Sequence, residues 1–153
     1  MTTIRTIMAA VDFSEYSVRA AEYAAQLAKD LNANLLLTNI YNQRDVNMMR
    51  EVAIRVPDFS VKKHLEEHIT ERKQKLQVLA KKLGSENLDI QMHVQIGVPY
   101  ETLLKEIDKH KPDLLVMGVK GRSDVVDMIV GSCAQKMFRR SPIPLLSIRT
   151  HKS

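Results

Sequence analysis

Three glycines and a serine near the carboxyl end of the chain form the group of residues best able to bind an anion. Gly118 follows the apolar run Leu114–Met117, and Gly121, Gly131 and Ser132 come after it. Glycine lets main-chain N–H groups come close to an anion because it has no Cβ. Ser132 would add a hydroxyl at the positive end of a helix. The spacing therefore predicts a phosphate-binding loop. The alternative is that the glycines only shape a crossover connection.

These residues need a sheet to position them. The short apolar run that ends at Gly118 is typical of a buried strand of a parallel sheet. A second run, Ile4–Val11, is followed by Asp12, and Ser14 is a good N-cap for the next helix. Asp12 is either a ligand-binding carboxylate or simply a residue that helps to begin this helix.

Apolar strand-like runs alternate with helix-like segments along the whole chain. The expected strands are Ile4–Val11, Leu35–Ile40, Ile90–Ile96, Leu114–Met117 and Leu145–Arg149. The expected helices are Glu15–Leu31, Val61–Leu83, Tyr100–His110 and Cys133–Arg140, with a further short helix allowed between Tyr41 and Ser60. Five alternations of strand and helix predict an α/β protein with a parallel sheet covered by helices on both faces. The segment between Tyr41 and Ser60 could be a lid, a dimer contact or an outlying part of the core.

Gly118, Gly121, Gly131 and Ser132 make the pattern G-x2-G-x9-G-S, which resembles the ATP-binding signature of the universal stress protein family. The opening VDFSEYSVRAAEYAAQLA and the ending SPIPLLSIR also resemble that family. Together with right-handed crossovers, the resemblance implies a three-layer α/β/α fold, Rossmann-like and similar to the adenine nucleotide alpha hydrolases. Its five strands would have the order 3-2-1-4-5. Ligands of such sheets bind where the strand order reverses, so Asp12 and Gly118 should meet at one crevice.

The resemblance implies an ATP site in that crevice, with or without a magnesium or manganese ion. Val11 and Asp12 would flank the base, the main chain of Asn39 would meet the adenine, and Met117 would lie near the ribose. The family often has valine where this chain has Asn39. The residues implied are Ala10, Val11, Asp12, Asn39, Met117, Gly118, Lys120, Gly121, Arg122, Gly131, Ser132, Cys133 and Ala134. Most phosphate contacts would come from main-chain N–H groups, with positive charge added by Lys120 and Arg122.

The composition of the chain limits the class of protein to which it can belong. The chain has 153 residues, 44% of them hydrophobic, and a net charge of +5, which predicts one domain over residues 1–153 and suits an anionic ligand. Its single cysteine, Cys133, excludes an internal disulfide framework, and a packing role is expected for it. We expect a cytoplasmic protein, because the chain has neither a signal-peptide pattern nor an apolar run long enough to span a membrane.

Two further patterns in the segment Val61–Leu83 favour ordinary surface roles. Its basic residues alternate with glutamates and lack interleaved aromatic residues, so no nucleic-acid partner is expected. His64 and His68 fall in an H-x-x-E-H pattern, but a catalytic zinc site needs a third protein ligand.

Three hypotheses for function follow. The chain could be an ATP-binding stress-response module that signals through unknown protein partners. It could be a slow ATPase or self-phosphorylating protein, with Asp124 and Asp127 near a metal, although the sequence offers no candidate base. It could also be a ligand-free dimeric scaffold. The resemblance implies a homodimer through the edge strand Leu145–Arg149.

Overall fold

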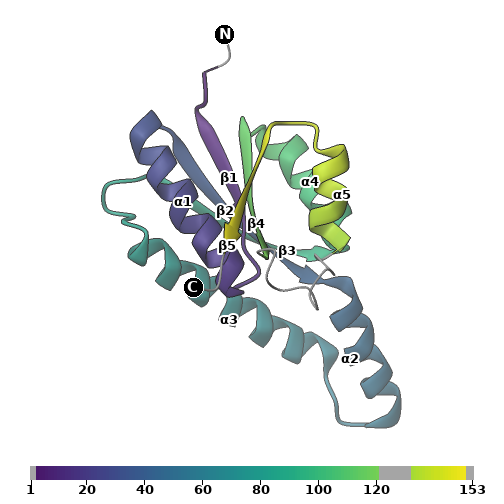
Figure 1. The fold of residues 1–153 in the computed structure, drawn as a ribbon. Helices are drawn as coiled ribbons and strands as arrows, with labels where there is room; N and C mark the ends of the chain where they lie inside the picture. The colour runs from purple at the N-terminus through teal and green to yellow at the C-terminus, as the bar shows by residue number, and fades with distance from the viewer. Residues whose placement is uncertain (1–2, 121–131, 151–153) are drawn as a thin grey trace.

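The computed structural model describes residues 3–120 and 132–150. Within this part of the chain, strands and helices alternate as expected (Figure 1). The strands are β1 (Thr6–Ala10), β2 (Asn34–Asn42), β3 (Ile90–Gly97), β4 (Leu114–Lys120) and β5 (Leu145–Thr150). The helices are α1 (Glu15–Leu31), α2 (Gln43–Arg55), α3 (Val61–Lys82), α4 (Pro99–His110) and α5 (Ser132–Arg140).

All five strands are parallel, and their order in the sheet is β3-β2-β1-β4-β5. This confirms the predicted fold class. The two edge strands are β3 and β5. The homodimer was predicted to form along β5, and pairing with a second chain stays a prediction.

Helices cover both faces of the sheet (Figure 1). Odd-numbered residues of β1 and β2, such as Ile7 and Leu37, pack with α1 and α3, which defines the α1/α3 face. Met8 and Leu36 pack on the opposite face with α4 and α5, which defines the α4/α5 face. Burial of side chains on both sides explains why the strands read as nearly continuous apolar runs.

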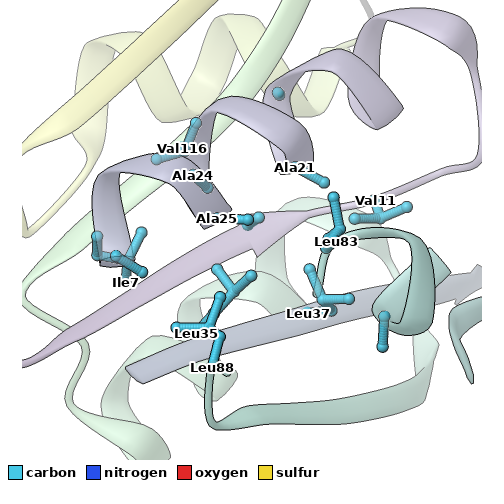
Figure 2. Packing of buried hydrophobic residues seen from close by; sticks show 14 of the residues in the cluster. Ile7, Val11, Ala21, Ala24, Ala25, Leu35, Leu37, Leu83, Leu88 and Val116 are labelled. Carbon is cyan, nitrogen blue, oxygen red and sulfur yellow. The ribbon is translucent and has the colours of Figure 1, made fainter. Parts of the chain in front are cut away.

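Helix α1 lies close to the sheet because its buried side is made almost entirely of small residues. Its buried residues are Ser17, Ala20, Ala21, Ala24, Ala25 and Ala28. Figure 2 shows Ala21, Ala24 and Ala25 on the helix above β1 and β2, near Ile7, Leu35 and Leu37 of the two strands. The helix begins and ends at the predicted residues. Ser14 caps its start, and Asn32 ends it in the left-handed conformation with φ of 54°.

The segment between Tyr41 and Ser60 forms helix α2 and an outlying part of the core. Tyr41, Val46 and Met49 make a small buried cluster against the first half of α3. Figure 1 shows α2 lying beyond the sheet, beside the start of α3. Most other apolar side chains of α2 stay exposed, including Ile54 at 85%. We call α2 and the first half of α3, residues 43–72, the α2–α3 arm.

The structure corrects one boundary. Strand β4 does not end at Gly118 but continues to Lys120, because Gly118 and Val119 pair with Ile148 and Arg149 of β5. Gly118 therefore lies inside a strand rather than in the loop that follows it. None of the helices described is both long and apolar enough to pass through a bilayer.

Candidate functional site

The candidate site lies at the carboxyl end of the sheet, where the strand order reverses at β1. Strand β1 pairs with β2 on one side and with β4 on the other, and the chain continues in opposite directions from these two neighbours. Crossover connections therefore leave the sheet on opposite faces at this point, which is where open α/β sheets generally bind their ligands.

The connection from β1 to α1 is a tight hydrogen-bonded turn around Asp12. The Ser14 N–H donates to Asp12 Oδ1 at 2.9 Å, and the Asp12 N–H donates to Ser17 Oγ at 3.2 Å. Phe13, between them, has a φ of 67°, which is unusual for a bulky residue. Strained backbone of this kind clusters at functional sites, and here it lies beside the exposed residue Asp12.

The Asp12 side chain is exposed and carries its charge at neutral pH. Partial burial acts to raise the pKa of Asp12, but hydrogen bonds from Ser14 and Ser17 outweigh it and leave the pKa below its usual value. The site therefore presents a fixed carboxylate beside the first turn of α1.

The start of α5 lies within electrostatic range of this carboxylate. The negative charge of Asp12 is the smallest of three influences on the pKa of Cys133. Burial is the largest cause and raises the pKa of Cys133, Lys136 opposes it, Asp12 adds to it, and the result is about 11. The thiol is therefore protonated at neutral pH and is a poor nucleophile, in agreement with the packing role expected for it.

Gly118 has a packing role that the sequence did not reveal. A Cβ at this position would overlap the main-chain carbonyl of Tyr16 and lie 3.0 Å from the Ser17 nitrogen. The first turn of α1 can therefore lie against β4 only because residue 118 has no side chain. This close approach holds the Asp12 turn beside β4.

Asn39 is fully buried, and both ends of its amide are hydrogen-bonded. Its Nδ2 donates to the Val11 carbonyl at 2.7 Å, and its Oδ1 accepts from Arg72 Nη1 at 3.0 Å. The Arg72 guanidinium also lies over the ring of Tyr41, 4.6 Å from its centroid. The side chain of Asn39 is thus committed to the protein itself.

Sequence reasoning did not single out Arg72 as part of the site. An asparagine in the apolar run Leu35–Ile40 was the available signal, because a buried amide needs hydrogen-bond partners on both its nitrogen and its oxygen. The identity of those partners required the packing of α3 on β2.

The remaining predicted residues fall into four groups. Val11 is buried on the α1/α3 face, whereas Ala10, Met117 and Ala134 pack on the α4/α5 face. The structure thus brings the ends of β1 and β2, the last part of β4 and the start of α5 to the same side of the molecule, at the carboxyl ends of the strands. Lys120 ends β4 and Ser132 begins α5. Gly121, Arg122 and Gly131 lie outside the described residues, as do Asp124 and Asp127.

The two histidines of the H-x-x-E-H pattern have separate protein partners. His64 stacks on Phe59 and hydrogen-bonds the Ser60 carbonyl at 2.8 Å, whereas His68 Nδ1 bonds the Tyr41 hydroxyl at 2.8 Å. Among the residues with described placement, no three histidine, cysteine or carboxylate side chains are grouped to hold a metal.

Comparison with known proteins gives a consistent picture. The model of the universal stress protein family matches residues 3–149. The "Universal stress protein in QAH/OAS sulfhydrylase 3'region" of Thermus aquaticus is 30% identical over 148 residues, covering 95% of this chain and 98% of that protein. The universal stress protein Rv1636 of Mycobacterium tuberculosis is 25% identical, covering 98% of this chain and 99% of that protein.

Solved structures share the fold. The universal stress protein UspA of Lactobacillus plantarum aligns with a TM-score of 0.76 at 17% identity, over 97% of this chain and 100% of that one. A universal stress protein solved in complex with cAMP aligns with a TM-score of 0.64 at 24% identity, over 99% of this chain and 100% of that one.

Proposed function

Because the chain belongs to the universal stress protein family, we propose that it binds ATP at the carboxyl ends of β1 and β4 and acts as a nucleotide-dependent module in the stress response. The observation that carries this proposal is the close packing of the first turn of α1 on Gly118 of β4, which sets the Asp12 turn beside the strand that leads to the glycine signature. A helix start supplies free N–H groups to an anion, and an exposed carboxylate can accept hydrogen bonds from a base or a ribose.

The chemistry of the described residues fits an adenine nucleotide better than a covalent or redox reaction. The Cys133 thiol stays protonated at neutral pH, and the Asp12 carboxylate is engaged by the amide of Ser14. The signature glycines and Ser132 would meet the phosphates mainly through main-chain N–H groups. One relative in complex with cAMP also supports an adenine nucleotide as the ligand.

Nucleotide recognition would be shared between two faces of the sheet. Val11 and Asn39 hold the β1–β2 side, where the base is expected, and Cys133 and Ala134 lie at the start of α5, where the phosphates are expected. Each helix-terminus contact with an exposed anion contributes only about 0.3–1 kcal/mol, so several must act together. A magnesium or manganese ion would therefore assist by neutralising phosphate charge.

The test begins with the protein as purified. The protein is denatured and the supernatant is assayed for nucleotide, and ATP is then titrated by calorimetry against adenosine and inorganic triphosphate. We expect ATP to bind more tightly than either fragment, with little ADP formed over hours. Steady ADP formation would favour the ATPase instead. Absence of both retained and titratable nucleotide would favour the ligand-free scaffold.

A variant tests the role of the glycine signature. Gly121→Val should weaken ATP binding at least about tenfold while leaving the unfolding temperature nearly unchanged, because only glycine lets the main chain come close to phosphate. Unchanged ATP affinity in this variant would contradict the phosphate site.

A further inference from the structure

Helix α3 is linked to the residues on both sides of Asp12, to Val11 through Asn39 and to Phe13 directly. On one side, Arg72 holds the Asn39 amide, and the amide holds the carbonyl of Val11. On the other side, the Lys75 ammonium lies 5.6 Å from the centroid of the Phe13 ring. Arg72 and Lys75, which are three residues apart on α3, thus lie on either side of the β1–α1 connection that carries Asp12, the candidate ligand-binding carboxylate.

The link through Asn39 has a defined direction. An asparagine amide can be flipped without changing its shape, so its partners decide which end faces which way. Arg72 can only donate, so the Asn39 oxygen must face Arg72 and the Asn39 nitrogen must face Val11. The Val11 carbonyl can only accept, so it requires the same orientation. Removing the guanidinium therefore leaves the buried Asn39 oxygen without a donor and removes the support that holds the amide against Val11.

Arg72 is itself held by more than one contact. Its guanidinium stacks over the Tyr41 ring, and the Tyr41 hydroxyl bonds His68 of the same helix. A guanidinium over an aromatic face is stabilised by attraction to the ring. Arg72 therefore joins the end of β2, the core of the α2–α3 arm and the Asp12 turn.

We propose that Asn39 and Arg72 couple the α2–α3 arm to the nucleotide site, so that nucleotide binding and the docking of α3 stabilise each other. This inference rests on the proposed ATP site. A ligand that fixes the Val11–Asp12 main chain also fixes the acceptor of Asn39, and hence the place of Arg72. By linkage, any effect of the arm on nucleotide affinity is matched by an equal effect of nucleotide on the arm. Arg72 acts through Asn39 and is a positioning residue.

Two variants separate the parts of this link. Arg72→Met keeps most of the apolar stem but removes every donor, so the buried Asn39 oxygen loses its partner and the amide is held from one end only. Asn39→Asp keeps an acceptor for Arg72 but cannot donate to the Val11 carbonyl. Lys73→Met is the matched control, because Lys73 is an exposed residue of the same helix and is placed on neither contact.

The experiment combines ATP titration with hydrogen–deuterium exchange of the full chain. In the native protein, ATP should slow exchange in α3 around residues 69–76 as well as around the Asp12 turn. Arg72→Met and Asn39→Asp should each raise the Kd for ATP about three- to tenfold, the range expected for one lost hydrogen bond. They should also abolish the ATP-dependent protection of α3, whereas Lys73→Met should change neither. Native affinity and native α3 protection in Arg72→Met would overturn the proposal.

The ligand-free exchange separates this proposal from the proposed function. Without nucleotide, both variants should exchange faster than the native protein and Lys73→Met at residues 11–17. If the native protein binds no ATP, both the proposed function and the coupling to nucleotide are wrong. Faster exchange of the turn in the variants would then still show that α3 holds it. Unchanged exchange of the turn would overturn the link itself.

Discussion

Thr38 and Asn39 are neighbours on β2 whose buried polar side chains point to opposite faces of the sheet, and only one of them is satisfied. Asn39, on the α1/α3 face, uses both ends of its amide, bonding Val11 and Arg72. Thr38, on the α4/α5 face, has a buried hydroxyl with no hydrogen-bond partner among the described residues. The buried polar side chain of β2 is therefore fully hydrogen-bonded on the α1/α3 face and unpaired, among the described residues, on the α4/α5 face.

The region around Thr38 extends into a second polar group. In the sheet register Thr38 lies beside His93 of β3. The ring centroid of His93 lies 4.6 Å from that of His110 of α4, and the two rings are tilted by 38°. Glu106 Oε2 lies 2.8 Å from His110 Nε2, although the two atoms are not aligned for a hydrogen bond. We call Thr38, His93, Glu106 and His110 the β3–α4 cluster.

The difference in hydrogen bonding indicates how each region should respond to substitution and to pH. A fully hydrogen-bonded buried network fixes its members in one arrangement, so removing one partner leaves the others unpaired. A partly satisfied cluster has fewer bonds to lose, and His93 within it can change charge. The region near Asp12 should thus be sensitive to substitution, and the β3–α4 cluster should be sensitive to pH.

The largest expected effect is the loss of the Asn39 amide. Asn39→Ala leaves the Val11 carbonyl and the Arg72 guanidinium without their buried partner and creates a cavity. We expect the free energy of unfolding to fall by about 2–4 kcal/mol. Urea denaturation of the native protein and the variant measures this loss. A loss below about 1 kcal/mol would mean that water replaces the amide, and that the network is weaker than its geometry indicates.

A smaller effect is expected from pH. Burial is the main cause that lowers the pKa of His93, His110 and Lys109 lower it further, and Glu106 acts in the opposite direction. Folded His93 therefore binds a proton less readily than unfolded His93. Its contribution to stability is complete above its ordinary pKa of 6.5 and is lost as the pH falls below that value.

Urea midpoints between pH 7.5 and 5.0 test this prediction. The midpoint should fall with pH in the native protein and fall less in His93→Gln, which cannot titrate. The lowered pKa of Asp12 does not affect this measurement. The contribution of Asp12 to the stability of the protein is lost only as the pH falls below the ordinary aspartate pKa of 3.8. Equal pH dependence in the two proteins would show that His93 is not the titrating group.

The smallest expected effect is at Thr38, the neighbour of Asn39. Thr38→Val replaces a hydroxyl that has no partner among the described residues by a methyl group of similar size. We expect a change within about 0.5 kcal/mol or a slight gain in the free energy of unfolding, since no protein hydrogen bond is lost. The same denaturation assay compares it directly with Asn39→Ala. A loss as large as that of Asn39→Ala would erase the contrast between the two faces.

The sequence predicted those features that depend on local pattern. The apolar runs, the Ser14 cap and the alternation of strand and helix are recorded in neighbouring residues, so the fold class and most boundaries could be expected. The end of β4 could not. Glycine usually signals a turn, but Gly118 is an extended residue whose missing side chain makes room for Tyr16.

By itself, the sequence determined the order of the elements, the parallel sheet and the candidate anion-binding residues, because each of these follows from residue type and spacing along the chain. Only the tertiary structure decided that Arg72 reaches Asn39, that the first turn of α1 packs on Gly118, and that Thr38 and Asn39 have different surroundings. These contacts join residues far apart in sequence, and they depend on where helices packed on the two faces of the sheet place their side chains. The spacing of residues along a strand predicts which face of the sheet each side chain occupies, but the packing of the helices decides which side chains it contacts there.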